Sequence, residues 1–517
     1  MKQTPAGPPL WEQFRRNAGL DDPLWRKFVG LWILVLGGIL AITAVVSLDF
    51  YQGDEHFQIL EFVNYKLQGI PASLMSWEFH TQMRPWLQPA VYLGIAKLVG
   101  KLGLHDPFVL AAAFRLLSGL FAWIMLSSMM LLSYHFFSDS SRRRASVYLL
   151  ALLCFLPYMF VRTTSESWST SFCLLGYALL LLGSRRLEGE RRDFPGGVLF
   201  VVGLLWGLAF EFRVQCAFLI LGFLLWMLFV ARNKTSTAIL GIVIVGAGMA
   251  VTVALGTVVD WWGYGNPVFV PWNYFFQNIV RNASSNFGTL PWWAYFVLAN
   301  NNLIAFVAIP LTVGILVAWV RYPKHSLVWG SLLYFLAHVA VAHKEARFLF
   351  PLAVPAAILF IYAWTPKFSK EDLFSRIWAR RRAWVFQVLF VLNAVGLIYA
   401  LTKHNVDLQF DQYAYYHLKA PYHVYVLRDS FALHPFYERD YRSLSKEVSV
   451  TDLTIDASSK VQSFLLTDGL DEYSPPPDVR FHLSYVESSL PLWIKQLNVL
   501  HWESKIKTWT LYRVEPQ

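Results

Sequence analysis

Long uncharged apolar runs alternate with short polar segments along most of this chain. The first run, Val29–Leu48, has the ~20 residues that a helix needs to cross a bilayer, and no small-residue cleavage site follows it. Judged by apolar length, the other candidate spans cover roughly residues 107–136, 145–163, 167–184, 196–210, 212–231, 236–258, 292–320, 325–342, 346–364 and 383–402. The pattern predicts an all-α polytopic membrane protein with about eleven transmembrane helices.

The basic residues between these runs predict the orientation. With the N-terminus in the cytoplasm, nearly every Lys/Arg cluster falls on one side, as the positive-inside rule requires. These clusters are Arg142–Arg144, Arg185–Arg192, Arg232–Lys234, Arg321–Lys324 and Lys367–Arg382. The two long loops on the opposite side, 49–106 and 259–291, are rich in Trp, Asn and acidic residues. Within the first loop, Leu87–Leu104 is apolar but carries Lys97 and Lys101, which predicts a helix lying in the membrane interface.

Composition supports this class and excludes others. Hydrophobic residues make up 56% and charged residues 15% of the 517 positions, which excludes a cytosolic protein with one apolar core and a disordered chain. The net charge of +10 lies in short clusters rather than one basic stripe, so no nucleic-acid partner is expected. Cys154, Cys173 and Cys216 all lie inside apolar stretches, where framework disulfides are not expected.

The two ends of the chain differ from the apolar middle. Residues 1–28 are polar and predict a cytoplasmic N-terminal segment, followed by a transmembrane module over 29–402. Residues 403–517 have mixed charge and β-rich patches such as Ser463–Thr467 and Thr508–Arg513. This length suits a small mixed α/β domain, which we expect on the non-cytoplasmic side.

Asp54 and Glu55 form an acidic pair just past the first predicted span. Two carboxylates that leave a membrane helix are costly to bury and otherwise face a water-filled cavity. A carboxylate at this position could act as general base on an acceptor hydroxyl. A solvated loop start is the alternative, because acidic residues at span ends are common.

Other candidate substrate-binding residues lie in the two long loops. Trp77 could stack on a sugar face, as could the aromatic residues that follow it, although membrane aromatic belts also explain such side chains. Glu78 and Arg84 lie close by, and Arg84 could bind phosphate or extend to lipid headgroups. Asn273, between Trp272 and Tyr274, belongs to a run of amides and aromatics that suits carbohydrate, but which alone is only a loop.

The densest ionic cluster reads His343-Lys344-Glu345-Ala346-Arg347-Phe348. On a helix, His343 and Arg347 would share a face, as would Lys344 and Arg347, forming a cationic site for a lipid phosphate. Plain membrane anchoring is the alternative, but anchoring charges are expected mainly on the cytoplasmic side and this cluster lies on the other.

Charged residues inside apolar stretches form a further group. They are Arg115, Arg162, Glu166, Glu211 and Arg213. Such residues usually face a cavity or pair with one another, and structural pairing is at least as good an explanation as substrate contact.

These motifs, in this order, resemble one family of membrane enzymes. The relevant elements are Asp54-Glu55, Trp77-Glu78-Phe79, Arg84 with Pro89, Asp260–Gly265, Gly288-Thr289 with Pro291-Trp292, and His343–Phe348. They resemble the dolichyl-phosphate-mannose-dependent mannosyltransferases of glycosyltransferase family 22, which have the GT-C fold. Within that family the likeness is to the enzymes that add the third mannose of GPI anchors. The resemblance covers roughly residues 30–365.

The resemblance implies a reaction and a set of roles. Such enzymes move a sugar from a polyprenyl-phosphate donor to a glycan or glycolipid hydroxyl, with inversion, on the lumenal or periplasmic face. They use no nucleotide sugar at the site and generally no metal, so no cofactor is expected. Carried over by position, Asp54 would be the general base, with Glu55 ordering the acceptor. His343, Lys344 and Arg347 would hold the donor phosphate.

The chain also departs from the eukaryotic members of the family. The stretch Leu466–Glu472 has no Cys-His motif, and the tail carries no evident ER-retention signal. These features favour a bacterial inner-membrane relative with a periplasmic site over an ER protein with a lumenal one. A transporter or flippase for a lipid-linked glycan is the alternative function, and inverted repeats with broken helices would favour it.

Overall fold

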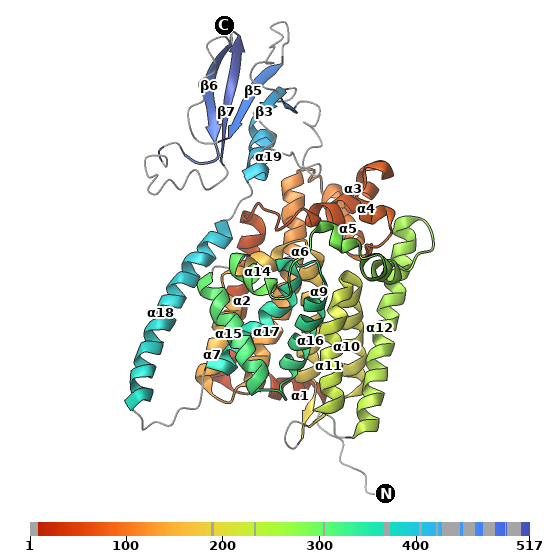
Figure 1. The fold of residues 1–517 in the computed structure, drawn as a ribbon, viewed down its shortest axis with the longest axis vertical. Coiled ribbons are helices and arrows are strands. Elements are labelled where there is room, and N and C mark those ends of the chain that lie inside the picture. Colours follow the sequence, from red (N-terminus) through yellow and green to blue (C-terminus); the bar gives the residue numbers. More distant parts are fainter. Residues whose placement is uncertain are drawn as a thin grey trace. The chain divides into compact units, whose positions relative to one another are not determined.

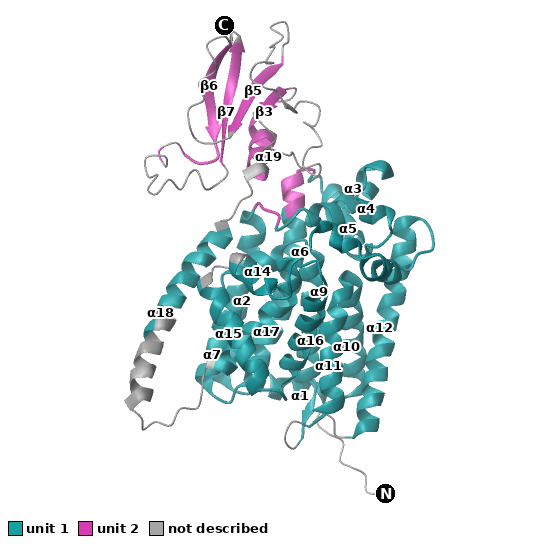
Figure 2. Ribbon diagram, viewed as in Figure 1, with its two compact units in different colours: residues 1–47, 51–104, 112–402 teal, residues 48–50, 105–111, 403–517 magenta. Residues whose placement is uncertain are grey.

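Helices dominate the computed structural model (Figure 1). It describes residues 9–187, 191–231, 234–302, 305–364, 373–402, 406–419, 422–426, 445–447, 461–468, 481–491, 493 and 508–516. The chain divides into two compact units, which are described separately (Figure 2). The first comprises residues 1–47, 51–104 and 112–402, and the second comprises 48–50, 105–111 and 403–517.

The longer helices of the first unit comprise those of the predicted apolar runs, the predicted interfacial helix within Leu87–Leu104 and one helix in the polar segment 1–28. They are α1 (Leu10–Asn17), α2 (Pro23–Val46), α5 (Leu87–Lys101), α6 (Pro107–Phe136), α7 (Ser140–Leu152), α8 (Phe155–Val161), α9 (Ser165–Leu182), α10 (Gly196–Phe212), α11 (Ala217–Phe229), α12 (Thr235–Tyr264), α14 (Ala294–Asn302), α15 (Ala305–Arg321), α16 (Ser326–Ala340), α17 (Phe350–Trp364) and α18 (Leu373–Thr402).

Shorter elements fill the loops of this unit. They are η1 (His56–Leu60), α3 (Glu61–Gln68), η2 (Ala72–Leu74), α4 (Trp77–His80), η3 (Val214–Cys216), α13 (Val270–Phe275), η4 (Phe276–Val280), η5 (Ala283–Phe287), η6 (Ala346–Leu349) and the two-stranded hairpin β1 (Arg185–Arg186) and β2 (Arg192–Asp193).

Several of these helices are long and apolar enough to cross a membrane. Among the described residues four meet that test alone, or six if each of two bent helix pairs counts as one crossing. Their outer faces expose large apolar side chains such as Leu34, Val243 and Val320, which suits contact with lipid. The structure is therefore that of an integral membrane protein, and the figure of about eleven crossings stays a prediction.

One predicted span is bent rather than continuous. The run 145–163 forms α7 and α8, which meet at an angle of 53° after Leu153. Pro157 explains the break, because a proline has no N–H to donate and its ring clashes with the carbonyl four residues earlier, here that of Leu153. The sequence predicted a span over 145–163 but not the bend within it.

The core of the first unit is built from helices that pack side by side. Helix α10 packs against α9 and α12, α11 against α16, and α15 against α17. Buried Leu, Val, Phe and Trp side chains from these helices form one continuous hydrophobic cluster. Cys154, Cys173 and Cys216 are buried in it as free thiols.

Helices α10 and α12 approach each other through glycines. A Cβ on Gly203 would lie 2.2 Å from the Val245 carbonyl oxygen, and one on Gly248 would lie 2.4 Å from that of Phe200. Real Cβ contacts are never this short, so the two backbones touch where a side chain would not fit. Small residues commonly serve this purpose between membrane helices.

This contact predicts a difference between two glycines of α12. In Gly248→Ala the new methyl group meets backbone, which cannot move without separating the helices, so we expect a loss of about 1–3 kcal/mol. Gly246→Ala meets nothing within 4 Å and should be neutral or stabilising by up to ~1 kcal/mol through helix propensity. Thermal unfolding in detergent measures both, and equal melting temperatures would contradict the close helix contact.

The second unit contains a small sheet. Its helix α19 (Val406–His417) precedes strands β3 (Tyr422–Val426), β4 (Ser445–Glu447), β5 (Gln462–Asp468), β6 (Phe481–Ser488) and β7 (Trp509–Pro516). The order is β4-β3-β5-β7-β6, parallel on the β4-β3-β5 side and antiparallel for β5-β7-β6. Phe410 of α19 packs on Trp509 against one face of the sheet. The small C-terminal sheet was expected from the sequence.

Candidate active site

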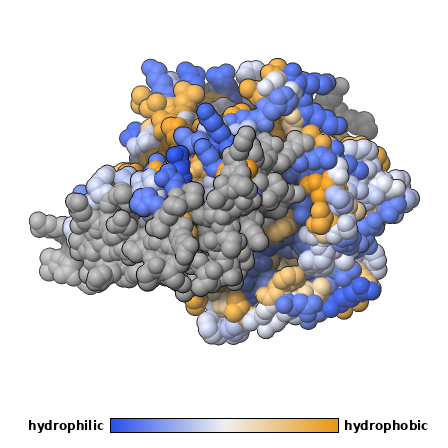
Figure 3. Space-filling view, turned by 90° about the horizontal axis from the view of Figure 1, so that it is seen from above, coloured by the Kyte–Doolittle hydropathy of each residue, from blue (hydrophilic) through white to orange (hydrophobic). Residues whose placement is uncertain are grey.

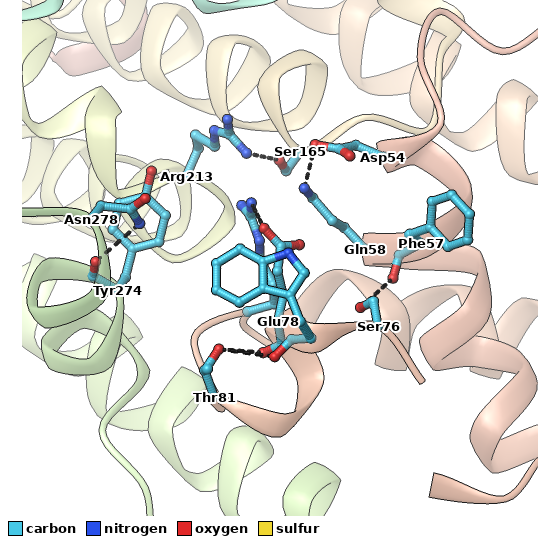
Figure 4. Close-up of polar contacts among 12 residues, drawn as sticks. Asp54, Phe57, Gln58, Ser76, Glu78, Thr81, Ser165, Arg213, Tyr274 and Asn278 are labelled. Atoms are coloured by element: carbon cyan, nitrogen blue, oxygen red, sulfur yellow. Dashed lines mark hydrogen bonds and ion pairs between the residues drawn. The ribbon is translucent and has the colours of Figure 1, made fainter. Parts of the chain in front are cut away.

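Asp54 and Arg347 meet although 293 positions separate them in the chain. Asp54 lies in the turn that leads into η1, and Arg347 lies in η6. Asp54 Oδ2 forms an ion pair with Arg347 Nη2. It also accepts a hydrogen bond from Gln58 Nε2 (Figure 4). The Asp54 side chain is 34% exposed and that of Arg347 only 6%. The structure thus joins the two segments that the sequence assigned to one site, and leaves the carboxylate accessible.

Arg347 is shared among carboxylates. Its Nε lies 2.7 Å from Glu345 Oε2 and 3.5 Å from Glu166 Oε1, in addition to the contact with Asp54. Glu166 in turn lies 2.9 Å from Arg213 Nη2. Glu166 and Arg213, two of the charged residues that interrupt apolar stretches, therefore belong to this cluster. From the sequence, their role could have been either pairing with each other or contact with a substrate. The Thr164 hydroxyl caps α9 by accepting from the Ser167 N–H and so fixes the turn that carries Glu166.

His343 joins the cluster through Glu345. Its Nε2 lies 2.8 Å from Glu345 Oε1, and its Nδ1 lies 2.8 Å from the Gly288 carbonyl oxygen, which belongs to the second long loop. Partial burial would raise the pKa of Glu345, but the charge of Arg347 and the hydrogen bonds from His343 and Arg347 lower it to about 2. Glu345 is therefore an anion that holds His343 and Arg347 together.

Residues 343–345 are not helical, so the shared helix face considered for His343 and Arg347 does not form. Glu345 has extended backbone angles, φ −132° and ψ 150°, and only Ala346–Leu349 form a helical turn. His343 and Arg347 still meet, because both side chains bind Glu345 rather than because they are four residues apart on a helix.

Lys344 points away from this cluster. Its Nζ donates to the Val339 carbonyl at 3.2 Å and to the Val341 carbonyl, so it caps the C-terminal end of α16. It also lies 5.7 Å from the centre of the Tyr295 ring. Burial lowers the pKa of Lys344. In this arrangement its ammonium group satisfies backbone carbonyls, as lysine commonly does at helix ends.

Glu55 lies beneath Asp54 and is fully engaged with protein groups. Its Oε1 accepts the Tyr51 N–H at 2.6 Å, and its Oε2 accepts the N–H and the hydroxyl of Thr163 at 3.0 and 2.9 Å. Burial raises the pKa of Glu55, opposed by Arg162 and by these hydrogen bonds. Glu55 ties the turn that carries Asp54 to Thr163, just before α9. These contacts suit a residue that positions Asp54 better than one that binds the acceptor substrate.

We therefore expect the two amide substitutions of this acidic pair to differ. In Glu55→Gln one buried N–H or hydroxyl would face an amide NH₂, and an unsatisfied buried donor costs about 1–3 kcal/mol. Asp54→Asn changes a partly exposed group and should shift the melting temperature much less. Thermal unfolding of both variants in the same detergent measures the difference; a larger loss in Asp54→Asn would contradict this assignment.

The other predicted substrate-binding residues lie at the join of the two long loops. Trp77 stacks on Phe287 with ring centres 5.8 Å apart, so a protein ring already covers one of its faces. Glu78 and Arg84 form a buried ion pair at 2.5 Å. Asn273 donates from Nδ2 to the Gln82 carbonyl at 3.1 Å. Asn273 therefore ties the loops together, and its amide nitrogen is already occupied.

Two of the aromatic residues that follow Trp77 are core residues. Trp86 and Tyr92 are fully buried, and Trp86 packs on Phe62. The alternative that these rings stack on sugar was wrong for Trp86 and Tyr92, because no face of either is accessible. A group of exposed aromatics instead lies in and directly after the second loop, at Trp261, Trp262, Phe269, Trp272, Trp292 and Trp293. Seen from above, separate hydrophobic patches lie among hydrophilic residues on the coloured part of the surface (Figure 3).

A cavity of ≈ 260 Å³, its open mouth included, lies next to Gln58, the residue that donates to Asp54. Its lining residues are Gln58, Ile59, Arg84, Pro85, Gln88, Ser165 and Phe212. Four of them are polar, and only Arg84 was singled out from the sequence as a candidate. Gln58, Gln88 and Ser165 were missed because single uncharged polar residues in loops and helix starts form no recognisable pattern.

The basic loops lie at the other end of the helices from this site. Asn17 of α1 donates to the Leu182 and Ser184 carbonyls, and the Arg192 N–H donates to the Ala231 carbonyl. Trp226 Nε1 donates to the Lys324 carbonyl. These contacts join, at one end, the described parts of the loops that follow α9, α11 and α15, away from the site loops. Arg232 of one predicted basic cluster and residues 367–372 of another lie outside the described residues.

Comparison with known proteins agrees with this architecture. The fold is that of a helical GT-C membrane protein: the crystal structure of ArnT from Cupriavidus metallidurans, bound to undecaprenyl phosphate, matches 94% of this chain and 98% of its own with a TM-score of 0.52 at 10% identity. The chain belongs to the Alg9-like mannosyltransferase family, whose sequence model matches residues 31–429.

Two eukaryotic relatives illustrate the similarity. "Mannosyltransferase APTG1" from Arabidopsis thaliana is 25% identical over 62% of this chain, and "GPI mannosyltransferase 3" from Drosophila melanogaster is 24% identical over 73% of it. The chain covers 55% and 63% of the length of these two proteins.

Proposed function

We propose that this chain is a membrane glycosyltransferase that moves a hexose, by family membership a mannose, from a polyprenyl-phosphate donor to a hydroxyl of a glycan or glycolipid. The observation that carries the proposal is the ion pair between Asp54 and Arg347. It puts an accessible carboxylate next to a guanidinium group, the two groups that such a transfer needs. The undecaprenyl phosphate bound by the ArnT structure is a lipid phosphate of the proposed donor class.

Each group has a role in the proposed step. Asp54 takes the proton of the acceptor hydroxyl, whose oxygen forms the new bond to the anomeric carbon. The bond from that carbon to the phosphate oxygen breaks on the opposite side, and the electron pair leaves with the polyprenyl phosphate, so the configuration inverts. Arg347, with His343 beside it, stabilises the charge that grows on the leaving phosphate. Glu55 positions the base, and Lys344 is omitted from the donor site because its ammonium binds backbone carbonyls.

The proposal places this end of the helices on the non-cytoplasmic side. Among the described residues, the basic loops that follow α9 and α15 lie at the opposite end, which the positive-inside rule assigns to the cytoplasm. The active end would then face the periplasm of a bacterial inner membrane, or the lumen of the ER in a eukaryotic host.

The test is acceptor-dependent release of free polyprenyl phosphate. The purified full-length protein in lipid nanodiscs is given a polyprenyl-phosphate mannose and a mannose-terminated glycolipid, and both products are followed by mass spectrometry. A transferase releases polyprenyl phosphate together with an extended glycolipid, whereas a flippase or a scaffold forms neither. Absence of both products across a panel of polyprenyl-phosphate hexoses and acceptors would overturn the proposal.

A further inference from the structure

Lys66, near the C-terminal end of α3, holds its ammonium group among three aromatic rings. Its Nζ lies 5.3 Å from the centres of two of these rings and 5.4 Å from the centre of the third. The rings belong to Tyr65, Trp86 and Trp262, and together with Lys66 they form what we call the Lys66 niche. Aromatic faces attract a cation and hold it in place, but they do not neutralise its charge.

The charge of Lys66 has no anionic partner in the described part of the chain. No carboxylate there lies within ion-pair distance of Nζ, and no oxygen accepts a hydrogen bond from it. Arg84 and Arg347, at the same end of the helices, are in contrast both paired with carboxylates. Burial lowers the pKa of Lys66, so the ammonium group has lost part of its hydration. Three N–H donors on such a cation favour an anionic acceptor from outside the chain.

The Lys66 niche is held in shape by α12. Helix α3 packs against α5, and α5 packs against α12 (Figure 1). Asp260 Oδ1 accepts the Trp86 N–H at 2.7 Å, and a Cβ on Gly263 would lie 2.1 Å from the Trp86 ring, so this ring lies directly on the helix. Trp86 and Trp262 meet edge to face with ring centres 6.0 Å apart. The niche therefore exists before any ligand arrives, which lowers the free-energy cost of binding one.

The exposed face of α12 indicates the depth of the niche in the membrane. Exposed apolar side chains recur every three or four residues and form one stripe, at Leu240, Val243, Ala247, Val251, Leu255 and Val258. The stripe is ~27 Å long at 1.5 Å per residue, close to the ~30 Å of bilayer hydrocarbon. Trp262 lies one turn further along the same face and is 50% exposed, as is typical of tryptophans at the membrane–water interface. The ammonium group of Lys66 therefore lies at the level of lipid headgroups, next to a lipid-facing surface.

Two further lysines at this end of the helices have no carboxylate partner. Lys97 and Lys101 of α5 are exposed, and neither forms an ion pair with a residue that the structure describes. Leu98 and Leu102, which follow them, are 56% and 69% exposed, a pattern typical of helices that lie on a charged membrane surface. The proposed orientation puts this end outside the cytoplasm, where few lysines are expected. Negatively charged headgroups explain why unpaired lysines occur here.

We propose that the Lys66 niche binds the phosphate group of an anionic phospholipid, whose acyl chains lie along the exposed stripe of α12. The ammonium group donates charge-assisted hydrogen bonds to the phosphate oxygens. A choline lipid binds less tightly, because its own cation already offsets the charge of its phosphate. This binding needs no sugar transfer, so it is independent of the transferase function proposed above.

The test measures lipid binding by the purified full-length protein in an uncharged detergent. Dioleoyl phosphatidylglycerol or dioleoyl phosphatidylcholine is added, and the bound lipids are counted by native mass spectrometry. Lys66→Met keeps the length of the side chain and removes the charge, so the tightest-bound phosphatidylglycerol should bind about tenfold more weakly than in the wild type. Lys66→Arg keeps the charge and should retain binding. Lys419→Met changes an exposed lysine of the second unit and is the matched control.

Thermal unfolding supplies a second measurement, which does not depend on a variant. Phosphatidylglycerol should raise the melting temperature of the wild-type protein more than the same concentration of phosphatidylcholine, because a ligand that binds only the folded state stabilises it. This difference should shrink at high ionic strength, where charge interactions at a surface are screened.

Three results would overturn the proposal. The first is equal affinity of the wild type and Lys66→Met for phosphatidylglycerol, and the second is equal stabilisation of the wild type by the two lipids. The third is displacement of phosphatidylglycerol by polyprenyl phosphate together with a raised donor KM in Lys66→Met, which would make a substrate lipid the occupant. Absence of sugar transfer by the wild-type protein would overturn the proposed function and leave the lipid site standing.

Discussion

Asp54→Asn should reduce sugar transfer by a factor of ~10²–10⁴, the usual contribution of a positioned general base. The amide keeps the size of the side chain but cannot take the proton of the acceptor hydroxyl. Folding should survive, because Arg347 retains its contacts with Glu345 and Glu166. Initial rates of acceptor-dependent polyprenyl phosphate release, at saturating donor and acceptor, measure the effect.

Binding of the donor should be little changed in this variant. The proposed phosphate ligands, Arg347 and His343, are intact in this variant. The donor KM should therefore stay within about threefold of wild type, which corresponds to the loss of no more than one neutral hydrogen bond. Asp21→Asn is the control, since Asp21 is a surface aspartate that pairs with Arg15 away from the site. Near-normal turnover by Asp54→Asn would remove Asp54 from the role of base.

Arg347→Lys should lower transfer by ~10²–10³, the usual effect of removing one preorganised donor from a transition-state anion. Lysine keeps a positive charge among the three carboxylates, so the net charge of the cluster is unchanged and the protein should fold. It loses the planar fork that lets one side chain bind Asp54, Glu345 and Glu166 and still face a phosphate. Turnover with a polyprenyl-phosphate mannose and the donor KM should both be measured.

Replacing Arg347 by alanine is a less informative change. Removing the cation leaves buried carboxylates unpaired, which typically lowers the free energy of unfolding by about 3–5 kcal/mol. A loss of activity could then come from unfolding as well as from a catalytic defect. Arg16→Lys serves as control, because Arg16 is an exposed residue of α1. Wild-type kinetics in Arg347→Lys would count against a donor phosphate bound at this guanidinium group.

Helix positions followed directly from apolar length, because a span must be long and uncharged. The run predicted over 107–136 is helix α6, and the one over 196–210 is α10 with two further residues. The bend after Leu153 was not predicted, although Pro157 in the same run is a residue that bends helices. The number of membrane crossings remains a prediction, because it depends on where the bilayer lies along the helices. The domain boundaries also remain predictions.

The site was only partly predictable. That Asp54 and Arg347 lie at the same end of the helices follows from counting spans, which is why their meeting could be expected. The details depend on local conformation: Glu345 has an extended backbone and links His343 to Arg347, whereas helical spacing had suggested direct neighbours. The position of Lys344 at the end of α16 was a signal for a capping role that the sequence reading did not use.

The glycine contact between α10 and α12 also bears on how mutations in this protein should be interpreted. The two helices run in the same direction, because Gly203 lies against Val245 and Gly207 against Thr252. One leads into Arg213, and the other carries Asp260, whose Oδ1 accepts the Trp86 N–H. Slippage by one turn would shift these groups relative to each other by ~5.4 Å. Substitutions deep in the bilayer, far from any substrate, should therefore produce defects that look catalytic in kinetic assays.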